Sequence, residues 1–119
     1  MKTAPVQPTD VNNEIWRLVK RCDEVIREIY TAGDAYAEKK ADYEDSHAQE
    51  VLKAEGTIQE KKAIADRKCF QFYKEFLKAD VRYKYLKTVL ETTRSQLSAC
   101  QSVGSNMRDE WEINKQHKT

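Results

Sequence analysis

Apolar residues recur at alternating spacings of three and four over two stretches of the chain, residues 10–55 and 58–103. This spacing places side chains on one face of an α-helix and repeats every seven residues. The first repeat consists of Ile15, Leu18, Cys22, Val25, Ile29, Ala32, Tyr36 and Tyr43. The second, which runs past its stretch, consists of Cys69, Phe72, Phe76, Ala79, Tyr83, Leu86, Leu90, Thr93, Leu97, Cys100, Gly104, Met107 and Trp111. Each stretch is therefore predicted to be a helix with one apolar seam.

Local signals mark the helix ends. Thr9 or Asp10 is a suitable N-cap for the first helix. Gly56 supplies the left-handed residue that commonly ends a helix, and Thr57 with Glu60 forms the T-x-x-E capping box that begins the next. Helices joined by so short a connection are antiparallel neighbours. The sequence predicts an all-α fold, a long antiparallel helical hairpin with coiled-coil-like packing, in which the numbers of facing residues add up to about 113.

Two places in the pattern predict local departures. Gly33 lies inside the first helix, where glycine costs about 1 kcal/mol relative to alanine, so a bend or loosening is expected there. Residues 102–106 can interrupt the second helix and leave a short terminal helix at about 106–114, which would carry Trp111. Alternatively, the helix continues through them.

Composition fits a thin helical protein. Of the 119 residues, 39% are apolar and 34% charged, which is typical of elongated helical proteins that form one domain and expose much surface. Both prolines, Pro5 and Pro8, fall in residues 1–9, which are expected to be a flexible lead before a single domain at 10–119. No stretch approaches the roughly 20 apolar residues of a membrane span, and no signal peptide is recognisable, so a cytoplasmic location without membrane contact is expected.

The three cysteines, Cys22, Cys69 and Cys100, have none of the close spacings that build zinc sites or redox pairs. All three fall in the apolar repeat, and the hairpin register brings none of them opposite another. We expect buried free thiols that act as small hydrophobic residues.

Enzyme chemistry finds little support in the sequence. His47 could form half of a metal site with Glu44 or Glu50, but no second His or Cys lies at ligand spacing, and a solvated or tyrosine-packed histidine is the alternative. His117 lies in a polar tail. No glycine-rich phosphate loop, nucleophile elbow or H-E-x-x-H pattern occurs. A non-enzymatic protein without cofactor or metal is predicted, and a metal-dependent enzyme assembled across protomers around His47 is a minor alternative.

Charge is distributed unequally, although the net charge is only +1. Residues 9–56 hold 12 acidic and 7 basic residues, whereas residues 57–94 hold 5 acidic and 10 basic residues. This asymmetry indicates either attraction within the hairpin or between protomers, or an anionic ligand on the second stretch.

The basic residues of the second stretch gather on one side. At 100° per residue, Arg67, Lys74, Lys78 and Arg82 fall within about 80° of one another, and Tyr85 shares the sector. Single-stranded DNA needs cations along its phosphates and flat side chains on which bases can stack. This basic stripe predicts a DNA-binding surface without sequence specificity; an acidic subunit face is the alternative occupant.

A second set of apolar residues lies away from the seam. Phe70, Tyr73, Leu77 and Val81 cluster about 140° from the seam of the second helix. Because two paired helices bury only one stripe each, this face needs another partner. We expect it to form, with Trp111, the interface of a homo-oligomer in which the basic stripe is repeated. The alternatives are packing by the N-terminal segment or an exposed platform for a ligand.

The run from Tyr43 to Cys69, YEDSHAQEVLKAEGTIQEKKAIADRKC, followed by KEFLKADVRYKYLKTVLETTRSQLSA, resembles the UvsY-like recombination mediators of tailed phages. The resemblance extends over roughly residues 30–112. It implies a helical protein that forms ring-like oligomers, binds single-stranded DNA and helps to load a recombinase onto strands covered by single-strand-binding protein.

The resemblance also bears on individual contacts. The family has a Lys-x-Arg pair near the end of its first helical portion, where this chain reads Lys53-Ala54-Glu55. Only the lysine is kept. The expected contacts therefore shift to Lys61, Lys62 and the stripe from Arg67 to Arg82, with Lys53 as a secondary candidate.

Together these features predict a non-enzymatic phage-type recombination accessory protein that oligomerises and binds single-stranded DNA, with a recombinase and a single-strand-binding protein as further partners. A phage structural, assembly or chaperone-like hairpin that acts through protein contacts is the alternative. Secreted hairpins of the W-x-G class are a weaker match, because the turn here reads Ala54-Glu55-Gly56-Thr57.

Overall fold

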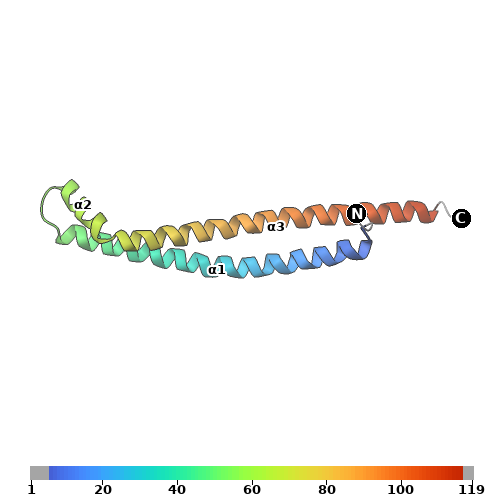
Figure 1. Cartoon of the computed structure of the whole chain (residues 1–119), viewed down its shortest axis with the longest axis horizontal. Coiled ribbons are helices and arrows are strands. Elements are labelled where there is room, and N and C mark those ends of the chain that lie inside the picture. Colours follow the sequence, from blue (N-terminus) through green and yellow to red (C-terminus); the bar gives the residue numbers. More distant parts are fainter. Residues whose placement is uncertain (1–5, 117–119) are drawn as a thin grey trace, which may run out of the picture. The chain divides into compact units, whose positions relative to one another are not determined.

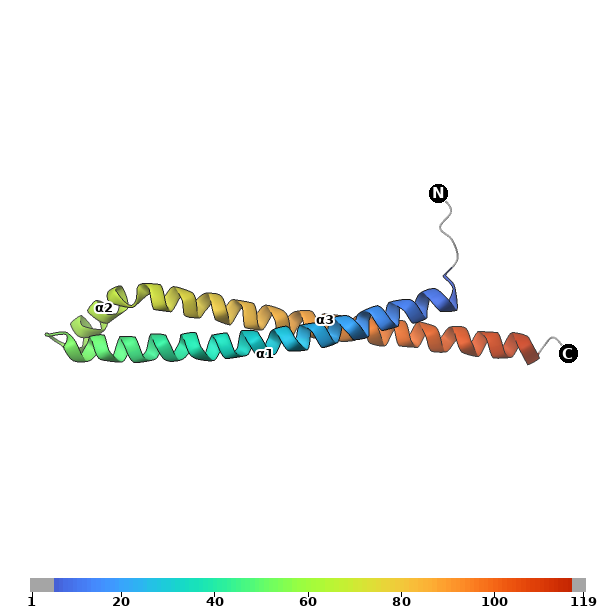
Figure 2. The same cartoon turned by 90° about the horizontal axis from the view of Figure 1, so that it is seen from below.

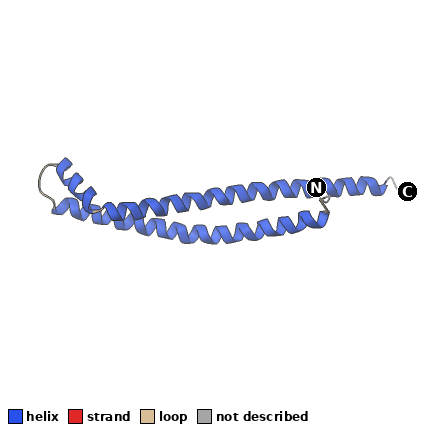
Figure 3. Ribbon diagram, in the orientation of Figure 1, coloured by secondary structure: helices blue, strands red, loops and turns tan. Residues whose placement is uncertain are grey.

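A computed structural model describes residues 6–116 of the chain. Over this range it consists of three helices in the order α1 (Pro8–Lys53), α2 (Ile58–Lys68) and α3 (Phe70–Gln116) (Figure 1). No strand occurs among these residues, and the helices account for nearly all of them (Figure 3). The predicted all-α class is confirmed.

Contacts divide the chain into two units. The turn unit, Arg27–Lys87, holds the C-terminal part of α1, all of α2 and the first part of α3. The end unit takes in the described residues up to Ile26 and those from Thr88 onward. Within each unit the segments of α1 and α3 lie side by side and run in opposite directions, as both views show (Figures 1 and 2). The antiparallel helical hairpin is therefore confirmed.

The register also agrees with the one predicted from the turn. In the turn unit the rings of Tyr36 and Phe76 lie 5.6 Å apart between their centroids. In the end unit a Cβ added at Gly104 would lie 3.4 Å from a methyl carbon of Val11. In both pairs the residue numbers add up to nearly the expected value.

The seam predicted from the heptads forms the core of both units. Leu18, Val25 and Cys69 are its most completely buried side chains, with exposed fractions between 0 and 2%. The other seam positions are buried or half-buried, with two exceptions. Phe72 and Trp111 are 42% and 70% exposed. One stripe on each helix thus supplies nearly all of the buried surface.

The connection after α1 follows the predicted capping chemistry. Gly56 has a φ of 118°, which an L-residue with a side chain rarely adopts. The hydroxyl of Thr57 accepts a hydrogen bond from the backbone N–H of Glu60 at 3.2 Å, which caps α2. Both local signals at the turn are confirmed.

The start of α1 differs from the prediction. The helix begins at Pro8, so Thr9 and Asp10 lie inside its first turn rather than at its cap. Asp10 instead accepts a hydrogen bond from the backbone N–H of Gln7 at 3.0 Å. Proline suits the first helical position because its missing N–H would have no helical partner there. Pro5 and the other residues of the lead before position 6 lie outside the described residues.

The long helices are interrupted at a place that was not predicted. α1 continues through Gly33, and α3 continues through residues 102–106, so the separate terminal helix does not form. The break lies at Cys69, whose φ of −98° and ψ of 12° separate α2 from α3. Cys69 donates its N–H to the carbonyl of Ala65 and accepts from the N–H of Tyr73. The chain therefore changes direction there while Cys69 itself keeps both of its backbone hydrogen bonds.

The two helical glycines differ in what surrounds them. A Cβ at Gly33 would lie 3.2 Å from the ring carbon Cε2 of Tyr83, closer than ordinary contact. A Cβ at Gly104 would meet only Val11 at 3.4 Å and Ile15 at 3.9 Å, within ordinary contact. Gly33 thus provides room for an aromatic ring, whereas Gly104 leaves space that a methyl group can fill.

We expect Gly104→Ala to raise the free energy of unfolding by about 1 kcal/mol, because alanine favours the helix and its methyl group fits beside Val11. Thermal unfolding followed by circular dichroism measures the change. Gly33→Ala serves as the matched control and should give a smaller gain, since its methyl group must displace the Tyr83 ring. A loss of stability in Gly104→Ala would contradict the packing described for the end unit.

Candidate nucleic-acid interface

One side of α3 in the turn unit forms a continuous groove. Six side chains line it: Lys74, Leu77, Lys78, Val81, Arg82 and Tyr85. Neighbouring members of this set are three residues or one residue apart in alternation. This spacing places all six side chains on one face of α3, which lies opposite the seam. The groove has a volume of about 410 Å³. We call this surface the α3 groove.

The α3 groove combines two features that the sequence pattern had separated. Its apolar side chains are largely exposed: Leu77 by 41%, Val81 by 67% and Tyr85 by 63%. Lys74, Lys78 and Arg82 are exposed beside them. Three cations of the predicted basic stripe, the neighbouring Tyr85 and two residues of the predicted oligomer interface thus belong to one surface. A ligand of this surface has to be both anionic and partly apolar.

The cations of the α3 groove lack acidic partners among the residues that the structure describes. Within the part of the chain that the structure describes, no carboxylate forms an ion pair with Lys74, Lys78 or Arg82. Three lysines elsewhere in the turn unit, Lys39, Lys68 and Lys84, do have such partners, for example Lys39 with Glu75 at 3.4 Å. The positive charge of the groove is therefore uncompensated and available to a ligand.

The other predicted DNA-binding residues do not line this groove. Lys61, Lys62 and Arg67 belong to α2, where Lys62 and Arg67 are exposed and Lys61 is half-buried. Lys53 is the last residue of α1 and is exposed. Arg67 was grouped with the stripe on the assumption of one continuous helix, and the break at Cys69 now separates it from Lys74, Lys78 and Arg82.

Phe70 and Tyr73, predicted for the oligomer interface, also lie outside the groove lining. Phe70 is 61% exposed at the first turn of α3. The Tyr73 ring lies 5.2 Å from that of Tyr43 on α1, between centroids, and 6.4 Å from that of Phe76. Tyr73 therefore contributes to the contact between the helices as well as to the surface.

Aromatic rings hold α3 against α1 behind the groove. The ring of Tyr36 lies 5.6 Å from that of Phe76 and 5.7 Å from that of Tyr83, and Tyr43 stacks on Phe76 at 6.0 Å. Such pairs contribute about 0.5–1.5 kcal/mol each beyond the area that they bury. The helix that bears the groove, α3, is thus packed against α1 on the side opposite the groove.

His47 connects α1 to α2. Its Nε2 lies 2.7 Å from Oδ1 of Asp66, and its ring packs 5.6 Å from that of Tyr43 between centroids. An ion pair between Glu50 and Lys68 at 3.4 Å joins the same two helices. His47 is therefore the tyrosine-packed histidine of the sequence analysis. Among the described residues, no group of three or more His, Cys, Asp or Glu is placed to hold a metal ion; His117 lies outside them.

The three cysteines are free thiols, as predicted. Cys22 and Cys69 are buried and Cys100 is half-buried. Burial raises the pKa of the Cys69 thiol, and the nearby carboxylates of Glu50 and Asp66 raise it further. The neutral thiol is the favoured form, which suits a core residue rather than a nucleophile.

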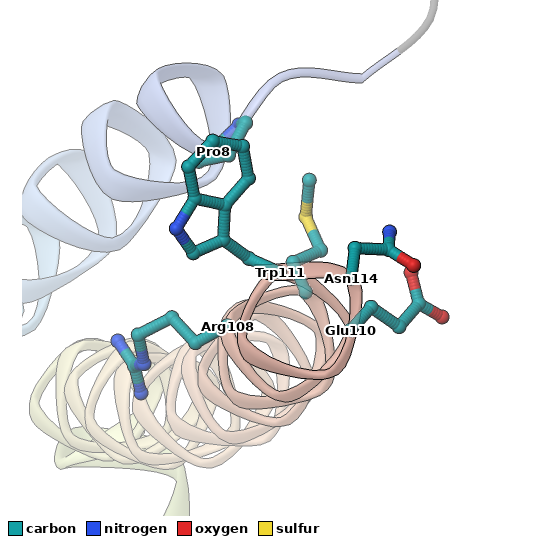
Figure 4. A pocket seen from close by; sticks show the side chains of 6 residues that line it. Pro8, Arg108, Glu110, Trp111 and Asn114 are labelled. Carbon is teal, nitrogen blue, oxygen red and sulfur yellow. The ribbon is translucent and has the colours of Figure 1, made fainter. Parts of the chain in front are cut away.

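A second hollow lies in the end unit, with a volume of about 490 Å³. The Trp111 side chain projects from α3 toward Pro8 at the start of α1, with Arg108 and Glu110 close by (Figure 4). Trp111 is 70% exposed, so it is available to a partner. Arg108 is the one cation that lines this hollow, and the acidic residue Glu110 lines it as well. The hollow therefore lacks the row of unpaired cations that marks the α3 groove.

None of the three helices in the described range is both long enough and apolar enough to span a bilayer. Comparisons with protein-family models, with curated proteins and with solved structures found no match to this chain. Inference about function therefore starts from the α3 groove.

Proposed function

We propose that this protein is a non-enzymatic accessory of DNA recombination that binds single-stranded DNA in the α3 groove. One observation carries the proposal: Lys74, Lys78 and Arg82, which have no acidic partner within residues 6–116, lie on the same exposed helix face as Tyr85. Cations that follow a phosphate track and an exposed ring for stacking are what this ligand requires.

The dimensions of the groove suit a short piece of strand. At 1.5 Å per residue, Lys74 and Arg82 lie about 12 Å apart along α3, roughly the length of three to four stacked nucleotides. The three cations would contact phosphates, while bases would stack on Tyr85 and rest against Leu77 and Val81. Phosphate contacts carry no base information, so no sequence preference is expected.

The role in recombination draws on the resemblance of the second arm to UvsY-like mediators. In this role the protein organises strands for a recombinase in the presence of a single-strand-binding protein, in the host cytoplasm if a phage encodes it. Self-association through a surface other than the α3 groove would place several grooves on one strand and raise the affinity through multiple contacts.

Binding should depend on salt in proportion to the number of phosphates held. With three phosphate contacts per protomer, the logarithm of the association constant should fall against the logarithm of salt concentration with a slope of about −2. Fluorescence anisotropy with a labelled oligothymidine strand, titrated at several salt concentrations, measures this slope. A flat response would rule out phosphate contacts as the basis of binding.

A structural or assembly protein that acts through protein contacts is the second candidate. The exposure of Leu77 and Val81 favours it, because these side chains also suit a protein partner. The same titration separates the candidates, since an assembly protein would leave the strand unbound even at low salt.

A further inference from the structure

The outer side of α1 in the turn unit carries a face whose charge is opposite to that of the α3 groove. At 100° per residue, nine residues fall within about 120° of one another. They are Tyr30, Asp34, Ala37, Glu38, Ala41, Glu44, Asp45, Ala48 and Leu52, and all are exposed. We call this surface the α1 acidic face.

The α1 acidic face is both charged and apolar. In the described part of the chain, Asp34, Glu38 and Glu44 have no basic partner, and Asp45 accepts only a hydrogen bond from the Gln49 amide at 3.0 Å. The large apolar side chains at its ends are strongly exposed, Tyr30 by 74% and Leu52 by 84%. The three alanines between them leave a shallow apolar strip.

We propose that the α1 acidic face of one copy of this chain binds the α3 groove of a second copy, and that single-stranded DNA competes with this contact. Three unpaired cations meet four carboxylates, and Leu77 and Val81 meet the alanine strip. The cations from Lys74 to Arg82 extend over about 12 Å along α3, and the carboxylates from Asp34 to Asp45 extend over about 17 Å along α1. The row of carboxylates is therefore long enough to face all three cations. The contact rests on this complementarity, and only the competition rests on the proposed function.

One chain cannot make this contact with itself. Within the turn unit, Tyr36 of α1 and Phe76 and Tyr83 of α3 fill the seam between the helices. The α1 acidic face and the α3 groove lie on the sides of their helices that point away from this seam. Since the contact joins two different surfaces, each copy offers one of each, and association can proceed beyond two copies.

Charge reversal tests the contact by sedimentation velocity over a range of protein concentrations. The groove variant carries Lys74→Glu, Lys78→Glu and Arg82→Glu; the face variant carries Asp34→Lys, Glu38→Lys and Asp45→Lys. Each variant alone should self-associate at least about tenfold more weakly than the natural chain, because opposed charges become like charges. An equimolar mixture of the two should associate again, since each reversed surface then meets a complementary one.

A third variant controls for net charge. It carries Lys20→Glu, Lys40→Glu and Arg94→Glu, exposed positions outside both surfaces, and it should associate like the natural chain. Circular dichroism confirms that all variants keep their helices. If the natural chain stays monomeric at all concentrations, or if the mixture does not recover association, the proposed contact is wrong.

Competition is measured with neutral substitutions, which avoid creating new DNA-binding cations. Asp34→Asn, Glu38→Gln and Asp45→Asn together should make the anisotropy titration several-fold tighter at concentrations where the natural chain associates. The control Asp42→Asn, Glu91→Gln and Asp109→Asn changes the net charge equally and should be tightened far less. If DNA affinity is identical in both variants while self-association differs, competition is wrong and the contact stands.

The two proposals fail in different ways. If the groove variant loses self-association but the natural chain does not bind DNA, the proposed function is overturned and the contact between copies is supported. If the natural chain binds DNA and the groove variant does not, while both self-associate equally, the contact is overturned and the proposed function is supported.

Discussion

Replacing Lys74, Lys78 and Arg82 together by glutamate should lower the affinity for single-stranded DNA by about 100-fold or more at low salt. Three phosphate contacts are lost, and three negative charges then face the strand. The side chains are exposed and unpaired in the described structure, so their replacement removes no contact that holds α3 in place. Anisotropy titration measures the affinity, and circular dichroism shows whether helix content is kept.

The matched control separates the groove from the general charge of the protein. Lys20→Glu, Lys40→Glu and Arg94→Glu change the net charge by the same amount at exposed positions outside the groove. This control should bind within a few-fold of the natural chain, most of all near physiological salt, where distant charges are screened. If both triple variants lose affinity equally, the strand responds to overall charge and the α3 groove is not the binding site.

The fold could be predicted closely because a two-helix core leaves few choices. The long helices α1 and α3 pack on one another within each unit, so their residues that recur at three and four spacings have to face the partner helix. Leu18 and Val25 were identified in this way and are almost completely buried. The turn was equally readable, since Gly56 and Thr57 have specific backbone roles.

The break at Cys69 could not be predicted from the same signals. No glycine or proline marks it, and Cys69 itself remains buried in the seam. The apolar repeat of the sequence therefore gives no sign of the break, whereas helical spacing groups outward side chains only within one helix. For that reason the spacing places Lys74 and Arg82, which share α3, on one surface, but does not carry over to Arg67, which lies in α2.

The α1 acidic face was missed for a different reason. Large apolar residues do not mark this face, because its centre is made of Ala37, Ala41 and Ala48. Their spacing of four and seven was a usable signal, because it places small side chains on one outer stripe. The structure adds the decisive information, which is that the surrounding acids are exposed and lack basic partners in the described part of the chain.

Leu18→Ala should lower the free energy of unfolding by about 2–3 kcal/mol. Leu18 is only 2% exposed, and truncating a buried leucine costs about 2–5 kcal/mol. The lower part of that range applies because a seam between two helices lies close to solvent and can partly collapse into the space. Urea unfolding followed by circular dichroism, at low protein concentration, measures the change.

Leu52→Ala is the matched control, since it is the same substitution on the same helix at a position 84% exposed. It should change the free energy of unfolding by less than about 0.5 kcal/mol. Equal losses in both variants would mean that the seam is not the core. Leu18 lies in the end unit and the α3 groove in the turn unit, so Leu18→Ala should keep its DNA affinity at temperatures where it stays folded. A variant that is less stable but binds normally would show that the seam maintains the fold while the outer faces bind partners.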